Sequence, residues 1–252
     1  MVFIGAKRIP TVTAAQMREV DRLAIEEFGL PLLSLMENAG RALASLAVRR
    51  FTVSRGKRIL CLAGEGGNGG GGLAAGRHLA NWGLEVEAVI LKSAPGSASE
   101  VQANILRRSE IQVHPAEELS RLDVRDFDLV IDAILGYSVR GNPSGPAKAM
   151  VETTNRAPRV LALDLPSGLN PDDGVPGTPC VRATATLTLA LPKPGLLRPE
   201  AAPYVGELWL ADLGIPMGVY ARLGLAVPPL FRAGQILRRL SGPARGLRAA
   251  PR

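Results

Sequence analysis

The sequence predicts an α/β protein with a mostly parallel central sheet that is covered by helices on both faces. Two observations predict this class. Short apolar runs typical of strands alternate with amphipathic helical segments from residue 58 onward. The first of these runs passes through a glycine-rich segment into a helix. At 252 residues, with 46% hydrophobic residues, the chain is long enough for one large α/β domain with a substantial core.

Two helices are expected before the first strand. Thr13 and Gln16 fit a capping box, and the apolar residues that follow predict a helix that ends before Gly29 and Pro31. A broad apolar stripe over residues 32–50 predicts the second helix. These helices are expected to cover a face of the sheet or to form a dimer contact.

The remaining elements follow in alternation. Strands are predicted at 59–63, 86–91, 111–113, 128–134, 160–165, 185–191 and 207–211. Helices are predicted at 73–82, 99–108, 116–122, 146–155 and 234–240. No convincing helix pattern separates the last two strands, so the sheet is expected to end in a less regular edge.

The positive charge of the chain is concentrated at its C-terminal end. Six arginines lie within residues 232–252 without any acid, and they account for all but one unit of the formal net charge of +7. We therefore expect one domain over residues 1–216, followed by an Arg-, Pro- and Gly-rich, partly disordered extension over residues 217–252. A basic end without interleaved aromatic residues is more typical of a solvated tail than of a nucleic-acid-binding surface, so no nucleic-acid partner is expected.

Neither a membrane segment nor a disulfide framework is expected. No apolar run approaches the roughly 20 residues that span a bilayer, and the first residues lack the long apolar core of a signal peptide. The two cysteines, Cys61 and Cys180, have no zinc-binding spacing. These features predict a cytoplasmic protein with no membrane partner and with two ordinary thiols.

The glycine-rich segment is the first candidate for a ligand site. Seven of the nine residues from Gly64 to Gly72 are glycine. Such a loop lets the backbone approach a ligand, and the N–H groups of the following helix favour an anion, so a phosphate or diphosphate is expected. A tight turn without a ligand is the alternative. The segment also fits the dinucleotide fingerprint, but Glu85 and Glu87 lie at the beginning of the next strand instead of its end, which disfavours an NAD-linked dehydrogenase.

Three polar loops, at 64–72, 132–142 and 164–168, are expected to meet at one edge of the sheet, because ligands gather at the carboxyl ends of parallel strands. Asp132 and Asp164 each follow an apolar strand, where an acid either caps a turn or acts in a site. As a pair they offer one carboxylate that binds a cation with Asn68 and Ser167. The other carboxylate would transfer protons.

Five further side chains could lie near this edge, and two of them, Arg140 and Lys193, have two interpretations each. Arg140 either contacts phosphate or lies on the surface, and Lys193, between two prolines, is either a placed ammonium or a solvated one. Tyr137 and Trp82 are expected to be packing residues. His78 has no second histidine near it in the sequence and is not expected to bind metal or to act in catalysis.

Six segments of the chain form a pattern: MENAG at 36–40, the glycine segment at 64–72, DAILG at 132–136, LDLPSG at 163–168, TLTLALPKPG at 186–195, and VG at 205–206 with DLGIP at 212–216. In their order and spacing they resemble the YjeF N-terminal family, the NAD(P)H-hydrate epimerases. The resemblance covers residues 13–216. It implies a Rossmann-like three-layer α/β/α sandwich, a homodimer, and interconversion of the R and S forms of hydrated NADH and NADPH, which carry a hydroxyl at ring carbon six.

The resemblance also implies roles for particular residues. Asp164 would contact the substrate and act as the acid or base, and a potassium ion would be bound by Asn68, Asp132 and Ser167. The residues expected to hold the nucleotide are Gly67, Asn68, Gly69, Gly70, Gly71, Gly136, Tyr137, Ser138, Val139, Arg140, Gly141, Asn142 and Asp164. A separate dehydratase would then remove the water from the hydrated cofactor.

The chain departs from the family pattern at two positions of the glycine segment. Gly67 stands where the family usually has the first of two asparagines, and Gly71 stands where it has an aspartate. These changes motivate an alternative, a non-catalytic module that keeps the fold and binds a nucleotide-like ligand, a protein or RNA. An NADP-linked oxidoreductase is a third hypothesis.

Overall fold

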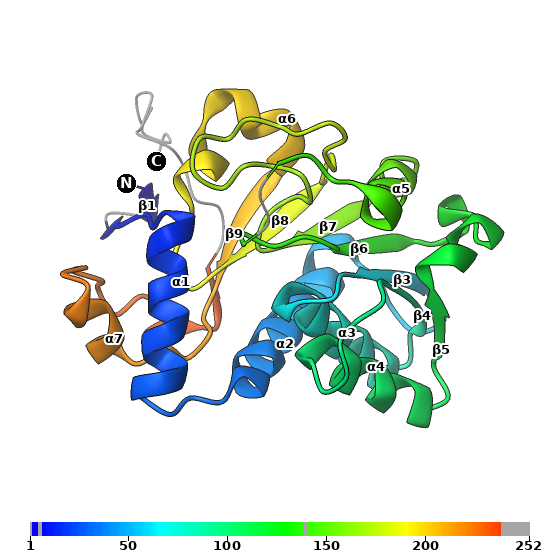
Figure 1. Cartoon of the computed structure of the whole chain (residues 1–252), viewed down its shortest axis with the longest axis horizontal. Helices are drawn as coiled ribbons and strands as arrows, with labels where there is room; N and C mark the ends of the chain where they lie inside the picture. Colours follow the sequence, from blue (N-terminus) through cyan, green and yellow to red (C-terminus); the bar gives the residue numbers. More distant parts are fainter. Residues whose placement is uncertain (1, 5–6, 139–140, 238–252) are drawn as a thin grey trace, which may run out of the picture.

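An eight-stranded sheet runs through the middle of the molecule, with helices above and below it (Figure 1). The computed structural model describes residues 2–4, 7–138 and 141–237. The strand order is β10-β9-β8-β7-β6-β3-β4-β5, and every neighbouring pair is parallel except β10 and β9. The predicted α/β class with a mostly parallel sheet is therefore confirmed.

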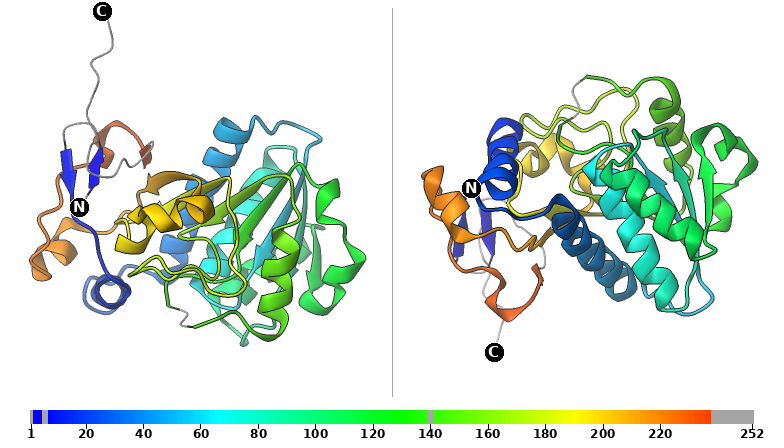
Figure 2. Two further views of the ribbon diagram at one scale, coloured as in Figure 1. Left: turned by 90° about the horizontal axis from the view of Figure 1, so that it is seen from above. Right: turned by 60° about the horizontal axis from the view of Figure 1, so that its bottom comes forward.

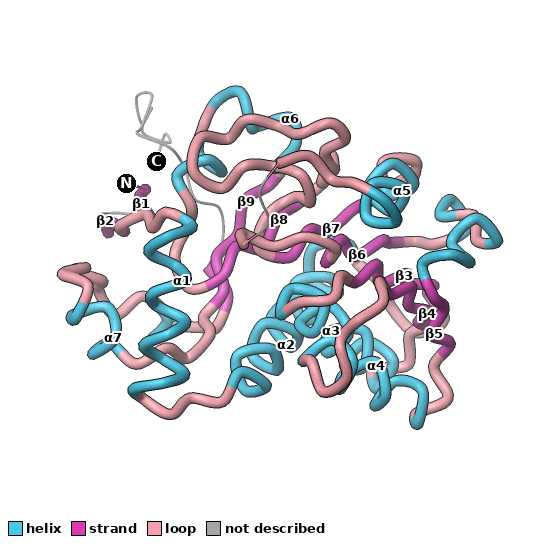
Figure 3. The backbone as a smooth tube through the Cα atoms, in the orientation of Figure 1, coloured by secondary structure: helices cyan, strands magenta, loops and turns pink. Residues whose placement is uncertain are grey.

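The strands and helices follow the predicted alternation closely (Figure 3). The strands of the large sheet are β3 (Arg58–Ala63), β4 (Glu85–Ile90), β5 (Gln112–Pro115), β6 (Leu129–Ala133), β7 (Val160–Leu163), β8 (Ala185–Leu189), β9 (Glu207–Ala211) and β10 (Ile236–Leu237). The α-helices are α1 (Ala14–Arg22), α2 (Leu32–Phe51), α3 (Gly67–Asn81), α4 (Ala98–Arg108), α5 (Gly145–Thr154), α6 (Ala202–Val205) and α7 (Met217–Arg222). Between β8 and β9 the described chain has two short 3₁₀ turns and the four-residue helix α6, which agrees with the predicted absence of a regular helix there.

Two apolar layers hold the helices to the sheet. Alternate residues of β3 point to opposite sides, so that Ile59 and Cys61 join one core cluster while Leu60 and Leu62 join the other. Helices α2, α3 and α4 cover the first face, and α5 covers the second (Figures 1 and 2). Because both faces are covered, the strands are continuous apolar runs instead of alternating ones.

The strand order reverses between β3 and β6. From β3 the chain proceeds outward to β4 and β5, and it then returns to β6 and continues in the other direction through β7, β8 and β9. In an open parallel sheet such a reversal leaves a crevice at the carboxyl ends of the two central strands. The loops after β3 and β6 lie at that crevice.

Several local features differ from the predictions. A small hairpin of β1 (Val2–Ile4) and β2 (Lys7–Ile9) precedes α1, and α1 continues as one π-helical segment, Leu23–Glu27. The helix predicted at 234–240 is wrong for its described part, because Ile236 and Leu237 pair with β9 as an edge strand. The end of the extension expected to be partly disordered, residues 238–252, lies outside the described residues.

Candidate functional site

Most of the glycine-rich segment, residues 67–72, is not a loop but the beginning of a helix. Helix α3 starts at Gly67, and residues 69–72 form its first turns. None of the seven glycines from Gly64 to Gly72 has a positive φ. The reason for glycine is close approach: a Cβ on Gly69 would lie 1.9 Å from the Gly64 carbonyl oxygen, and a Cβ on Gly72 would lie 2.3 Å from the Ala133 Cβ. The expected glycine loop is therefore corrected to a helix start packed directly onto β6.

A cavity of about 370 Å³ opens beside this helix start, and we call it the inner pocket. Its polar lining consists of Asp21, Glu65, Asn68, Tyr137, Ser138, Asp164 and Lys193. Its apolar lining consists of Met17, Leu32, Leu35, Met36, Ala39, Leu91, Ile134, Leu135, Leu163, Leu189 and Leu213, and the glycines are Gly66, Gly67 and Gly136. The pocket is thus mostly apolar with a few convergent polar groups, the usual composition of a small-molecule site.

A buried ion pair joins two loops at the inner pocket. The Lys193 ammonium donates a hydrogen bond to the Asp164 carboxylate and a second one, of 3.1 Å, to the Leu189 carbonyl oxygen. The exposed fractions of the Lys193 and Asp164 side chains are 1% and 4%. Asp164 has a φ of 68°, a left-handed conformation that aspartate tolerates better than most residues. Of the two interpretations of Lys193, the structure has the placed ammonium and not the solvated one.

A second polar contact ties α1 to the loop after β6. The Tyr137 hydroxyl donates to the Asp21 carboxylate with an oxygen–oxygen distance of 2.5 Å. Burial raises the pKa of Asp21, against the opposing effects of the Tyr137 hydrogen bond and the Lys193 charge. Burial also raises the pKa of Tyr137. The Lys193 ammonium lies 5.7 Å from the centre of the Tyr137 ring, so the two pairs are neighbours.

Asp132 and Ser167 lie beneath the pocket and not on its wall. Ser167 donates to Asp132 through its hydroxyl (2.5 Å) and its backbone N–H (2.8 Å), and the Ile134 N–H adds a bond of 3.3 Å. The Ser167 hydroxyl also accepts from the Leu135 N–H at 2.8 Å. Burial raises the pKa of Asp132 to about 6 although these bonds oppose it. The network fixes the loop after β6 against the loop after β7.

Asn68 adjoins this network from the first turn of α3. A Cβ on Gly136 would lie 3.1 Å from the Asn68 Cβ, so the loop after β6 passes very close to the start of α3. The Asn68 amide nitrogen is buried and has no hydrogen-bond partner within the described part of the chain. A buried, unpaired amide costs free energy unless a ligand or water satisfies it.

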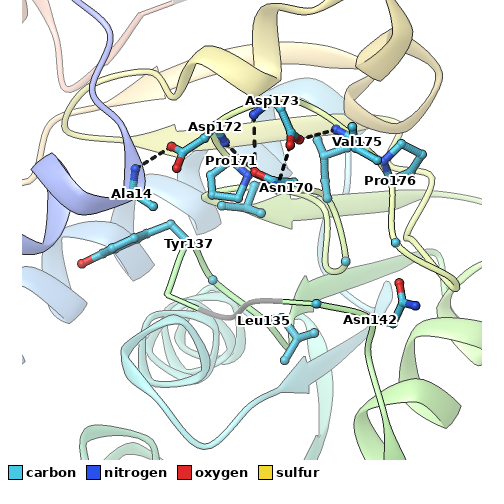
Figure 4. A pocket seen from close by; sticks show the side chains of 16 residues that line it. Ala14, Leu135, Tyr137, Asn142, Asn170, Pro171, Asp172, Asp173, Val175 and Pro176 are labelled. Atoms are coloured by element: carbon cyan, nitrogen blue, oxygen red, sulfur yellow. Dashed lines mark hydrogen bonds between the residues drawn. The ribbon is translucent and has the colours of Figure 1, made fainter.

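Figure 4 shows the residues that line a second cavity, of about 570 Å³, which we call the outer pocket. The two pockets share the wall made by Leu135, Gly136 and Tyr137. The outer pocket is also lined by Gly141, Asn142 and much of the loop from 165 to 177. Its far side is held to α1, because Asp172 accepts a hydrogen bond of 2.7 Å from the Ala14 N–H (Figure 4).

The predicted site residues fall into five groups. Gly67, Asn68, Gly136, Tyr137, Ser138 and Asp164 line the inner pocket, and Gly136, Tyr137, Gly141 and Asn142 line the outer one. Asp132 and Ser167 are completely buried and line neither pocket. Gly69, Gly70 and Gly71 line neither pocket and instead pack against neighbouring elements. Val139 and Arg140 lie outside the described residues.

Three charged residues of the inner pocket, Asp21, Glu65 and Lys193, are not among the predicted site residues. The sequence does not decide between a placed and a solvated Lys193 ammonium, although the two flanking prolines indicate a fixed position. Asp21 was missed entirely. Its signal was an acid placed four residues after Met17, on the apolar stripe of the first helix.

The likeness to known proteins agrees with this arrangement. The pattern of the YjeF-related protein N-terminus matches residues 32–195. The chain belongs to this family. Within the family, the NAD(P)H-hydrate epimerase of Dehalogenimonas lykanthroporepellens is 45% identical over 233 residues, which cover 91% of this chain and 93% of that protein. The NAD(P)H-hydrate epimerase of Rhodopirellula baltica is 35% identical, over 83% of this chain and 86% of that protein.

Some family relatives are much longer. The bifunctional NAD(P)H-hydrate repair enzyme Nnr of Moorella thermoacetica is 38% identical over 83% of this chain, which spans 41% of that protein. Among solved structures, the crystal structure of yeast YNL200c matches with a TM-score of 0.78 and 23% identity, over 91% of this chain and 100% of that one. This likeness confirms the Rossmann-like sandwich. No helix within the described residues is long and apolar enough to cross a membrane.

Proposed function

We propose that this family member is an NAD(P)H-hydrate epimerase, which interconverts the R and S forms of hydrated NADH and NADPH. The observation that carries the proposal is the Asp164–Lys193 pair, a carboxylate held beside an ammonium in an apolar pocket at the reversal point of the sheet. Relatives with this activity in their names cover nearly the whole chain, which supports the same chemistry.

The two pockets together suit a dinucleotide. The inner pocket, at about 370 Å³, has room for the hydrated nicotinamide ring, and the outer pocket offers space for more of the nucleotide. The first N–H groups of α3 receive no side-chain cap. Because uncapped N–H groups and the helix dipole favour negative charge, the start of α3 is suited to a phosphate of the substrate.

The chemistry needs a carboxylate near the ring. For the configuration at carbon six to invert, the hydroxyl leaves as water, and water then adds to the other side of the ring. In between, the ring nitrogen shares its lone pair with carbon six and the ring is cationic. Asp164 stabilises that positive charge and exchanges a proton with the water, while Lys193 fixes the position of the carboxylate.

We further propose that Asn68, Asp132 and Ser167 hold a potassium ion. The candidate ligands are an amide, a carboxylate and a hydroxyl oxygen, the oxygen donors that hard cations take. The Asp132 carboxylate is buried and has no ion pair with a cationic side chain within the described residues. Its oxygens, the Ser167 hydroxyl and the Asn68 amide oxygen are the atoms that would hold a monovalent ion. The described residues contain no group of three or more His, Cys, Asp or Glu side chains that could hold a metal. A bound cation would supply a fixed positive charge beneath the pocket.

The setting of the enzyme follows from its substrate. We propose that it acts in the cytoplasm as a homodimer on hydrated NADH and NADPH, and that a dehydratase consumes one epimer as the next step of repair. The longer relatives named as bifunctional repair enzymes support this pairing of activities.

The test is a coupled assay. The R epimer of hydrated NADH is supplied with a dehydratase that consumes only the S epimer, and the protein is expected to accelerate consumption. Asp164→Asn is expected to lower the rate by at least about 100-fold, the lower range for a proton-transfer group. Asp126→Asn, which removes an exposed carboxylate that lines neither pocket, serves as the control and should change nothing. No acceleration by the unmodified protein, or full activity of Asp164→Asn, would refute the proposal.

A further inference from the structure

The inner pocket contains a second acidic couple that the roles given so far leave unused. Asp21 reaches the pocket from α1, and its carboxylate accepts a hydrogen bond from Tyr137, which lies in the loop after β6. Asp164 and Lys193 come from the loops after β7 and β8. Two carboxylates on different elements therefore line one cavity, each with its own hydrogen-bonding partner.

The two carboxylates are held in different electrostatic settings. Asp164 is directly paired with an ammonium, whereas Asp21 accepts from a neutral hydroxyl. The titratable groups that face Asp21 are Tyr137 and, at longer range, Lys193, Asp164 and Tyr220. Burial and the Asp164 charge raise the pKa of Asp21, while Tyr137 and Lys193 lower it. Because Tyr137 donates to one Asp21 oxygen, Oδ2, the other oxygen is available to carry a proton.

We propose that Asp21 is a second catalytic residue of the epimerase, the proton-transfer partner of Asp164, and that Tyr137 positions it. This inference rests on the proposed function. Inverting one carbon atom requires a hydroxyl to leave from one side of the ring and water to add from the other, so a single acid cannot serve both events equally well. A pocket with two carboxylates on separate elements meets this requirement.

The step balances as follows. Asp21 gives its proton to the hydroxyl on carbon six, the carbon–oxygen bond breaks with its electron pair on oxygen, and water leaves. The lone pair of the ring nitrogen forms the double bond to carbon six. Solvent water then adds to the other side of that carbon, forming the new carbon–oxygen bond and restoring the nitrogen lone pair, while its proton passes to Asp164. In the opposite direction the two acids exchange roles, and solvent returns the proton between turnovers.

The fold keeps Asp21 in place at both ends of its helix. The Ala14 N–H at the start of α1 donates to Asp172 in the loop after β7, and Glu27, just beyond α1, pairs with Arg222 of α7. Met17 and Val20 on the same helix are buried. Asp21 is therefore presented by a helix that is tied to the loops of the site and is not a mobile surface acid.

The experiment compares Asp21→Asn with Tyr137→Phe in the coupled assay over a range of pH. Asp21→Asn should lower kcat at least about 100-fold, with KM changed less than about threefold, and should remove one limb of the pH profile. Tyr137→Phe keeps the carboxylate and should lower kcat less than about tenfold. Since the Tyr137 hydrogen bond lowers the pKa of Asp21, its loss should move the same limb to higher pH.

Controls separate the possible failures. Glu26→Gln removes an exposed acid from the segment that continues α1 and should leave rate and profile unchanged. Asp21→Glu should recover part of the activity lost in Asp21→Asn. If Asp21 and Tyr137 merely clasp α1 to the loop, Asp21→Asn and Tyr137→Phe will raise KM alike and leave the profile unchanged, which overturns the inference. If Asp21→Asn does not fold, the pH profile of Tyr137→Phe decides: a limb that stays at the pH of the unmodified protein overturns the inference. If the unmodified protein shows no epimerase activity, the proposed function is overturned as well. If the unmodified protein is active and Asp21→Asn has the same kcat and pH profile, only this inference is overturned.

Discussion

The Lys193 ammonium and the Asp164 carboxylate form an ion pair that is almost completely withdrawn from solvent, with 1% and 4% of their side chains exposed. The two residues lie in separate loops, after β8 and β7, so the pair holds one side of the inner pocket together. A buried charge that loses its partner is far more costly than a buried pair.

Replacing one partner of this pair should therefore destabilise the whole fold. We expect Lys193→Met to lower the free energy of unfolding by about 3–5 kcal/mol, because Asp164 would be left with no opposite charge. The Lys193→Met/Asp164→Asn double variant should be more stable than the sum of the single effects predicts. Urea unfolding of the four proteins measures this coupling.

An exposed ion pair provides the comparison. Lys148 and Glu152 are 3.9 Å apart on α5, with about half of each side chain exposed. We expect Lys148→Met to change the free energy of unfolding by less than about 0.5 kcal/mol. A similar loss in both lysine variants would mean that burial of the Asp164–Lys193 pair has no energetic consequence.

The close packing of the helix start onto β3 and β6 makes a second prediction. In Gly69→Ala the new Cβ would meet the backbone of Gly64, with the nearest atom at 1.9 Å, and backbone cannot move aside as a side chain can. We expect a loss of about 3 kcal/mol or more, at or above the upper range for overpacking. Thermal unfolding by circular dichroism measures it.

Gly66 is the matched control for this variant. It lies three residues earlier, its φ is −96°, and a Cβ built on it has nothing within 4 Å. Gly66→Ala should therefore unfold within a few degrees of the unmodified protein. Equal effects at both positions would show that flexibility, not close approach, explains the glycines.

Much of the fold follows from local pattern. The apolar runs of the parallel strands are readable because both faces of the sheet are covered, and the capping box of Thr13 and Gln16 is present as predicted. The helical state of residues 67–72 was not readable, because glycine has poor helix propensity and only tertiary packing overrides it. The edge strand β10 has two residues, too few for any period to appear.

The meeting of the predicted loops at one cavity follows from the sequence, but the full lining of that cavity does not. The carboxyl ends of parallel strands fix where loops meet, so Asn68 and Asp164 could be assigned to one pocket from the chain alone. The place of Asp21 on the apolar stripe indicates that it faces the interior, but no local pattern says that α1 lies beside this pocket, so Asp21 could not be assigned to it. Burial of Lys193 likewise depends on the distant Asp164, 29 residues away.

The hydrogen bonds between Asp132, Ser167 and the loop after β6 make a third prediction, which concerns how potassium ions change the stability of the fold. Ser167→Ala removes the hydrogen bonds that the hydroxyl donates to the Asp132 carboxylate and the Leu135 carbonyl oxygen. It also removes the one that the hydroxyl accepts from the Leu135 N–H. We expect a loss of about 1–3 kcal/mol, since both partners stay buried. In about 100 mM KCl the unmodified protein should unfold at a higher temperature than in choline chloride of equal ionic strength, and Ser167→Ala should lose most of that difference.

The control is Ser109→Ala, which removes a hydroxyl that donates to the Ile105 carbonyl oxygen at an exposed helix end. It should retain the full response to potassium. A response that is absent from the unmodified protein would count against the proposed cation site but leave the stability loss of Ser167→Ala intact.

The two cysteines make the last prediction, because their thiols are buried in different parts of the core. Burial raises the pKa of Cys61 and of Cys180 to about 12 in each case. At pH 8 a thiol with such a pKa is ionised in only about one molecule in ten thousand, against roughly a quarter for an ordinary thiol, and the thiolate is the reactive form. We expect neither cysteine of the folded protein to react with iodoacetamide at pH 8 while a free peptide thiol does. In urea both should be labelled, as mass spectrometry would show, and Cys61→Ser and Cys180→Ser assign the two sites. Rapid labelling of either thiol in the folded state would mean that the strand or loop that carries it opens to solvent far more readily than its burial implies.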